Sequence, residues 1–373
     1  MRTRLAWHDL KHRRLRTLTA LLGVVFAVTL IFMQTGFYQA CRDSAVRIHR
    51  LLDYDLMLTA PGYAFIIESG HISRDRLAQA RRINGVEAAI PLRVGGRLWR
   101  NPQTGNPTEL LLLGVRPSDH PFALESLDLD RLTQLDTALF DRAAHPSLGQ
   151  NPPGTESEIF GHRLRVVGDF HWGAGFVGDG LAIISEESFE RIFEPPPSKV
   201  EVGLIQLAEG VSPEAVVAQL EQTLPRDVSV WTREEIERRD QRFFLSERPI
   251  GLMFTSGMAL AVMVGGVILF QILASEVTSR RAELATLQAL GYGRRAVYGV
   301  VFEQGLLYTI FAFIPASLTA AALFTVTEQL ARLPMRLDAP LIAGVFGLSL
   351  LMCVLGAFFA SRRVRSADPA DLF

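Results

Sequence analysis

Four long apolar segments constrain this chain more than any other feature of its sequence. A helix of roughly 20 apolar residues crosses a bilayer core of about 30 Å, and segments of that kind occupy residues 17–37, 250–272, 297–324 and 341–360. The first is longer than the ~7–15 apolar residues of a signal peptide, and no small-x-small cleavage site follows it. We therefore predict four transmembrane helices, the first of them a retained anchor.

Basic residues near the ends of these segments predict their orientation, because arginine and lysine accumulate on the cytoplasmic side. They concentrate in residues 1–16, in the connection 273–296 and in the tail 361–373. The connection 325–340 carries only Arg332 and Arg336, offset by Glu328 and Asp338. We therefore expect both termini in the cytoplasm. Residues 1–16 also show an amphipathic pattern that is typical of a helix lying along the membrane surface.

The remaining residues, 38–249, then form one large extracytoplasmic domain. Strand patterns occur in "DYDLMLTA" and in "RLWRNPQTGNPTELLLLGV", which predicts a hairpin with a turn rich in Asn, Pro and Gly. Helix patterns alternate with them, as in "VEVGLIQLAEGVSPEAVVAQLEQTLPRDVSVW". The predicted fold class is thus a membrane α-helical protein, one span plus three, with a mixed α/β domain between the first and second spans.

Composition and motifs exclude several functions. The net charge of −1 gives no general attraction to nucleic acid. Neither lysine, Lys11 nor Lys199, stands in the Gly-Lys-Ser/Thr setting of a phosphate-binding loop, so we expect no ATP-hydrolysing site in this chain. An internal disulfide between Cys41 and Cys353 is not expected, since they lie at different depths of the membrane. His8 and His12 are four residues apart but have no third metal ligand nearby, and the other six histidines are scattered singly, so we expect neither a metal nor a catalytic site.

The segment "SRRAELATLQALGYGRR", residues 279–295, predicts a short helix between the second and third spans. Glu283 lies in its first turn, where the helix dipole favours an acid. Leu284, Leu287 and Leu290 share one stripe, and Gly291 suits a C-terminal cap. Such a short helix is marginal without a partner. The pattern therefore leaves two interpretations open: a connection with basic flanks, or a docking helix for a cytoplasmic protein.

Several stretches resemble one known family. "RRAELATLQALG" and the tail "RRVRSADPADLF" are similar to the segments after the second and last spans in permeases of the FtsX/MacB superfamily of ABC transporters. "LAWHDLKHRRLRTLTALLGVVFAVTLIFMQTGF" and "VVGDFHWGAGFVGDGLAIISEESF" resemble the DevC-type permeases within it. Together with the one-plus-three arrangement of spans, the resemblance covers nearly the whole chain.

The resemblance implies a function and a set of partners. Residues 282–291 match the coupling helix, so Glu283, Leu284, Leu287 and Gly291 become the residues expected to contact a separate ATP-binding subunit, which holds the ATP and Mg²⁺. A homodimer in a bacterial inner membrane is implied. DevC-like systems also use a periplasmic adaptor and an outer-membrane duct to export lipid-like or glycolipid cargo. FtsX-like members instead relay ATP hydrolysis to cell-wall hydrolases, and related pairs release lipoproteins.

Two further sets of residues stand out. Glu303 and Gln304 lie inside the third span, where polar groups should face protein or water rather than lipid. Trp172 and Phe176 lie in the glycine-rich stretch "GDFHWGAGFVGDG", which is either a hairpin that closes a β subdomain or a surface that contacts the adaptor. For the function of the whole chain, one alternative from a different functional class stays open: a membrane-anchored sensor without an ATPase.

Overall fold

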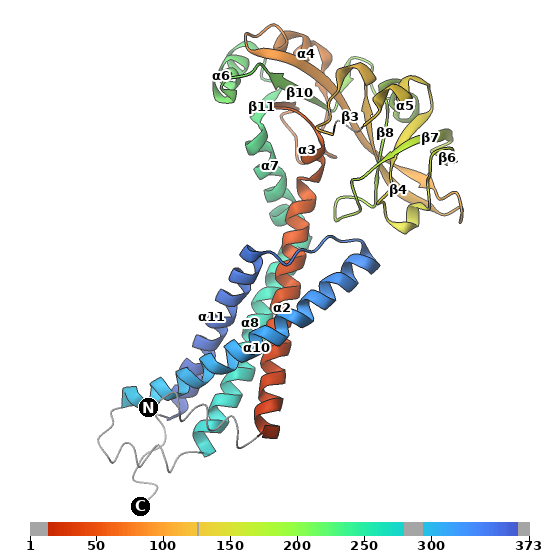
Figure 1. Ribbon diagram of the computed structural model, residues 1–373. Helices are drawn as coiled ribbons and strands as arrows, with labels where there is room; N and C mark the ends of the chain where they lie inside the picture. Colours follow the sequence, from red (N-terminus) through yellow and green to blue (C-terminus); the bar gives the residue numbers. More distant parts are fainter. Residues whose placement is uncertain (1–13, 125–126, 280–293, 365–373) are drawn as a thin grey trace, which may run out of the picture. The chain divides into compact units, whose positions relative to one another are not determined.

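The computed structural model describes residues 14–124, 127–279 and 294–364 (Figure 1). These residues form two compact units. The helical unit comprises the chain up to residue 39, residues 252–330 and the chain from residue 335. The α/β domain comprises residues 40–251 and the short segment 331–334.

The helical unit contains the four predicted spans. Each of its helices is long and apolar enough to cross a membrane, which confirms that prediction: α2 (Arg14–Ala45), α8 (Pro249–Ser279), α10 (Arg294–Ala331) and α11 (Ala339–Val364). α2 continues eight residues beyond the predicted end of the first span, so the chain enters the α/β domain as a helix. Pro315 lies inside α10 without ending it.

One glycine in α8 and one in α11 allow close packing within the helical unit. A Cβ atom on Gly265 would lie 2.9 Å from the Cβ of Ala27 in α2. On the α11 side, a Cβ atom on Gly356 would lie 3.1 Å from the carbonyl oxygen of Gly266. These distances are shorter than ordinary van der Waals contacts, so larger residues would push α2, α8 and α11 apart.

One nine-stranded sheet organises the α/β domain, in the order β11-β1-β10-β3-β4-β8-β5-β7-β6. Its strands are β1 (Leu56–Thr59), β3 (Val86–Arg100), β4 (Pro107–Val115), β5 (Thr137–Asp141), β6 (Glu156–Ile159), β7 (His162–Phe170), β8 (Leu181–Ser185), β10 (Val202–Leu207) and β11 (Ser229–Thr232). β3 and β4 form the predicted hairpin, paired from Arg93↔Gly114 to Arg100↔Pro107. A separate pair joins β2 (Ile72–Ser73) and β9 (Lys199–Val200).

The long strand β3 belongs to two subdomains, as its course in Figure 1 shows. Its first half pairs with β10 and, with β1 and β11, forms what we call the sheet subdomain. Helices α4 (Arg74–Ala80) and α6 (Pro213–Thr223) cover one face of this sheet through Leu77, Val216 and Leu220. The hydroxyl of Ser73 caps α4 by accepting from the amide of Asp75.

The second half of β3 starts what we call the barrel subdomain, which continues through β4, β8, β5, β7 and β6. A pairing of Trp99 with Ile159 joins β6 back to β3 and closes the strands on themselves. Their inward side chains form a core around Trp99 and Phe140, and helix α5 (Glu186–Phe193) adds Phe189 and Ile192 to it. Closure protects strand edges that would otherwise pair with other chains.

Candidate functional site

Arg93 lies on β3 where the strand passes from one subdomain to the other. The preceding residue, Leu92, pairs with Val202 of the sheet subdomain, whereas Arg93 pairs with Gly114 of the barrel subdomain. We call this point the elbow. The Arg93 side chain has no exposed surface. A fully buried guanidinium is costly unless carboxylates pair with it.

Carboxylates from both subdomains supply that pairing. Glu190 of α5 accepts from an Nη2–H of Arg93 at 2.6 Å, and Glu186 lies 3.4 Å from its Nε. Glu201, between β9 and β10, lies 3.7 Å from its Nη1. Arg93 therefore attracts charges from the barrel subdomain on one side and from the sheet subdomain on the other.

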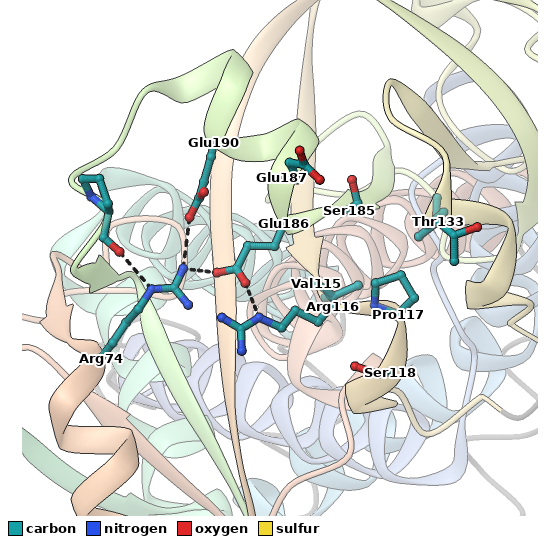
Figure 2. Close-up of a pocket in the computed structure, with 12 residues that line it drawn as sticks. Arg74, Val115, Arg116, Pro117, Ser118, Thr133, Ser185, Glu186, Glu187 and Glu190 are labelled. Atoms are coloured by element: carbon teal, nitrogen blue, oxygen red, sulfur yellow. Dashed lines mark hydrogen bonds and ion pairs between the residues drawn. The ribbon is translucent and has the colours of Figure 1, made fainter.

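Two more arginines complete the network, as the dashed lines in Figure 2 show. Arg74, at the start of α4, donates to both Glu186 and Glu190 and also to the carbonyl of Pro197. Arg116 donates from Nε to the second oxygen of Glu186 at 2.6 Å. Because Arg74 comes from the sheet subdomain and the glutamates come from α5, this contact also crosses the elbow.

The pKa values of two glutamates respond to the network in opposite directions. Burial alone would raise the pKa of Glu186, but the hydrogen bonds and charges of Arg74 and Arg116 outweigh it and hold that pKa below its ordinary value. For Glu201 burial prevails: its pKa is raised although the charges of Arg93 and His71 oppose the shift. The arginines of the network thus hold Glu186 as a carboxylate. At Glu201 the neighbouring positive charges offset only part of the cost of burying a carboxylate.

A polar pocket of about 650 Å³ opens beside this network (Figure 2). It is lined from the sheet subdomain by Arg74 and Pro197, and from the barrel subdomain by residues that include Arg116, Thr133 and Glu187. Its guanidinium and carboxylate groups bind chiefly one another, so the pocket marks a seam between subdomains rather than a site arranged for chemistry. Among the described residues no group of three His, Cys, Asp or Glu side chains could hold a metal ion.

The glycine-rich loop, residues 171–180, packs against the end of the first long helix. Both carboxylate oxygens of Asp141 hold its start, accepting from the amides of Trp172 at 2.9 Å and Gly173 at 2.8 Å. Arg47, just after α2, donates to the carbonyls of Gly173 and Ala174 at 2.8 and 2.7 Å. Its guanidinium also lies over the Trp172 ring, 5.6 Å from the centroid, as in a cation–π contact.

This packing changes the interpretation of the two aromatic residues of the loop. Only 8% of the surface of Trp172 is accessible, and the guanidinium of Arg47 lies over its ring. Phe176 is half-buried, and its amide donates to the hydroxyl of Ser44. The loop therefore supports the helix that enters the domain, which the sequence pattern alone did not indicate.

Of the predicted intramembrane polar residues, Gln304 is 9% exposed and Glu303 is half-buried in α10. Gln304 thus faces protein, as expected for a polar group within a span. Glu283, Leu284, Leu287 and Gly291, and also the amphipathic segment 1–16 up to residue 13, lie outside the described residues. Their roles stay predictions.

Sequence reasoning missed the elbow. One signal for it exists: Arg93 interrupts the apolar run "AAIPLRVGG" of a strand, and a lone arginine in a buried strand requires partners. Those partners are Glu186, Glu190 and Glu201, roughly a hundred residues away, and no local pattern connects them to Arg93.

Two family models match the chain. A MacB-like periplasmic core domain matches residues 17–223, more than half of the chain, and an FtsX-like permease C-terminal region matches residues 255–369. These matches and the α/β domain between the first and second apolar helices define a permease component of the ABC transporter class. The chain belongs to the FtsX/MacB superfamily of such permeases, as its motifs predicted, and that family implies an ABC ATPase as partner.

Three solved structures are similar to part of the chain. The periplasmic region of MacB from Actinobacillus actinomycetemcomitans has 10% identity and a TM-score of 0.37, over 51% of this chain and 94% of that one. The extracellular domain of the transporter YknZ from Gram-positive bacteria has 11% identity and a TM-score of 0.34, over 48% of this chain and all of that one.

A domain of a permease protein from Porphyromonas gingivalis has 16% identity and a TM-score of 0.29, over 49% of this chain and 87% of that one. With TM-scores below 0.5, these similarities add nothing to the family assignment, which rests on the two family models. No curated protein matches the chain in sequence.

Proposed function

We propose that this chain is the permease subunit of an ATP-driven exporter and that it transmits ATP hydrolysis in a separate subunit to movement of its α/β domain. One observation carries the proposal: a permease of this superfamily holds its α/β domain between the first two of four apolar helices, and its sequence contains no phosphate-binding loop. In this proposal the energy comes from a separate ATP-binding subunit, and the helices that enter the domain are the route by which motion reaches it.

The proposed arrangement places both termini and residues 273–296 in the cytoplasm, following the distribution of arginines. Residues 38–249 then lie in the periplasm of a bacterium with an outer membrane. Residues 282–291 dock on the ATPase, with Leu284 and Leu287 against an apolar surface and Glu283 opposite a basic residue. A second copy of the chain completes the transporter, and the membrane lipids surround its exposed apolar side chains.

The DevC-like sequence stretches support an exporter that works with a periplasmic adaptor and an outer-membrane duct on lipid-like or glycolipid cargo. Within the glycine-rich loop, the proposed adaptor contact falls to Phe176, because Trp172 is packed against Arg47. Replacing Phe176 by serine should weaken adaptor recovery without preventing folding. Phe160, exposed at the turn between β6 and β7, provides the matched control for the same substitution.

The second candidate function keeps the fold and changes its output. FtsX-like members relay ATP hydrolysis to cell-wall hydrolases, and related pairs release lipoproteins. The match of residues 255–369 to an FtsX-like permease C-terminal region is compatible with these outputs as well as with export. Both functions require the ATPase contact, so they differ only in what binds the α/β domain. The remaining alternative, a sensor without an ATPase, requires neither the ATPase contact nor either of these two outputs.

Affinity purification of the tagged chain from its own membranes in mild detergent tests these proposals together. We expect an ATP-binding subunit to co-purify and to be lost in Leu287→Arg, with Leu98→Arg, an exposed site on the barrel subdomain, as the control that retains it. An adaptor in the eluate selects the exporter, and a hydrolase selects the relay. A folded chain that recovers no ATPase would overturn both and favour the sensor.

A further inference from the structure

Two helices connect the α/β domain to the spans that precede and follow it in the chain. α3 (Arg47–Leu51) follows α2, and α7 (Arg233–Arg242) leads through the π-helical turn η4 (Phe243–Glu247) to α8. We call α3 and α7 the root helices. They are separated by more than 180 residues of sequence, so any contact between them must come from tertiary structure.

A buried side-chain pair joins the two root helices directly. Nε2 of His49 on α3 lies 2.8 Å from Oδ2 of Asp240 on α7, and neither side chain has exposed surface. The hydroxyl of Tyr63 donates to the same carboxylate oxygen at 2.9 Å. On the other side of the imidazole, Nδ1 of His49 lies 2.7 Å from the hydroxyl of Tyr54.

One arrangement of the hydrogen atoms satisfies all three of these contacts. Asp240 as a carboxylate accepts from Nε2–H of His49 and from Tyr63, and Nδ1 of His49 accepts from Tyr54. Burial raises the pKa of Asp240, although the hydrogen bonds from His49 and Tyr63 oppose the shift. The carboxylate therefore depends on these two donors, and losing either leaves a buried charge poorly paired.

Contacts around the pair hold the same two helices. Arg233 of α7 donates to the carbonyl of His49 at 2.7 Å and lies over the ring of Tyr54, 4.9 Å from its centroid. Arg239 donates to the carbonyl of Tyr63 at 2.7 Å. A capping box at Thr232 and Glu235 fixes the start of α7, so Asp240 is presented from a well-formed helix.

We propose that Asp240 is a positioning residue that acts through His49 to make the two root helices one cooperative unit. Displacement of either root then moves both, and the sheet subdomain receives the motion of the two spans together. The cooperative link between the helices depends only on the contacts above. Its role in transmission rests on the proposed function.

Hydrogen exchange of the full-length chain in detergent tests the link. In the wild type, the amides of α3 and α7 should share one opening equilibrium and respond alike to added denaturant. Asp240→Ala should lower the protection of both helices by about 100-fold or more, because it leaves His49 and Tyr63 without their buried acceptor. Asp240→Asn, which retains an acceptor oxygen, should restore most of that protection.

Glu201→Ala is the control, because it removes another buried carboxyl from the same domain at a site that contacts neither root helix. It should leave α3 and α7 protected. Independent exchange of the two helices in the wild type would overturn the proposal, and so would a loss confined to α7 in Asp240→Ala. Independent exchange in the wild type overturns the proposal even if a variant does not fold.

The same experiment separates this inference from the proposed function, because it uses no ATPase. Shared exchange of the root helices in a chain that recovers no ATPase would retain the link and refute the transporter role. A chain that binds an ATPase but whose root helices exchange independently would retain the transporter role and refute the link.

Discussion

The guanidinium of Arg93 and the carboxylate of Glu190 meet at 2.6 Å across the core of the elbow, with Arg93 fully buried. Arg93 lies on the strand that both subdomains share, and Glu190 lies on the helix that covers the barrel subdomain. Their contact fixes α5 against β3 at the point where the strand changes partners. The rigidity of the domain at the elbow therefore depends on charges rather than on apolar packing alone.

Replacing Arg93 by methionine should destabilise the α/β domain strongly. The substitution retains much of the side-chain volume but leaves Glu186, Glu190 and Glu201 without their shared cation, and breaking a buried pair costs about 3–5 kcal/mol. Chemical unfolding of the purified chain measures the loss. Arg100→Met removes an exposed pair with Glu158 and should cost about 1 kcal/mol or less. Equal losses in the two variants would contradict the prediction.

The pH dependence of stability should carry the signature of Glu201. The pKa of Glu201 is raised in the folded chain. Its contribution to the free energy of unfolding is therefore fully present below the pKa of an unfolded glutamate, about 4.3, and is lost as pH rises through the folded pKa. The wild type should thus lose stability relative to Glu201→Gln as pH rises through this window.

Glu186 should show the opposite sign, since its folded pKa is lowered and its contribution is lost as pH falls. Unfolding free energies measured from pH 3.5 to 7 for the wild type and for Glu201→Gln and Glu186→Gln decide both signs. Parallel curves for the three proteins would show that the pKa of neither glutamate is shifted in the folded chain.

Alanine at Gly175 should weaken the contact of the glycine-rich loop with the end of α2. Its Cβ atom would lie 2.9 Å from the hydroxyl of Ser44 and 3.3 Å from Nη1 of Arg47, and overpacking of this kind costs about 1–3 kcal/mol. Hydrogen exchange at Gly173 and Ala174 reports the loosening. Gly62→Ala, where no atom lies within 4 Å of the added Cβ, should leave the loop unchanged.

Leucine at Gly265 should impair the packing of the helical unit. The Cβ atom alone would lie 2.9 Å from the Cβ of Ala27, and a leucine adds three more carbons to that contact between α8 and α2. We expect a lower melting temperature in detergent and poorer recovery from membranes. Gly347→Leu on α11, with open space around the added Cβ, is the control. A normal melting temperature for Gly265→Leu would indicate that the helices separate easily.

The spans and the hairpin were predictable because each depends on a local pattern. About 20 apolar residues define a span wherever they occur, and "NPQTGN" between two apolar strands defines a turn. The elbow and the root helices depend on distant residues. His49 and Asp240 lie among other charged residues, so neither segment marks them as a pair. Tertiary contacts, among them the pairing of β1 with β10 and β11 and the hydrogen bond from Arg233 to the carbonyl of His49, bring those segments together.

Trp172 shows the same limit for a single residue. A tryptophan among five glycines suggests an exposed ring, since glycines supply no neighbours to bury it. Its ring lies against the guanidinium of Arg47, the first residue of α3, which stands more than a hundred positions earlier in the sequence. Neighbours in sequence therefore do not supply the contacts of this ring.

The pairing of β1 with β11 determines how the domain can be isolated or exchanged in experiments. The first and last strands of the domain are neighbours, and the root helices on either side of them are bound together by His49 and Asp240, so the chain enters and leaves the domain at one place. A domain with adjacent ends behaves as an insertion into its host. Residues 40–251 could therefore be expressed alone as a soluble protein, exchanged between related permeases, or replaced by a short linker that joins the first two spans.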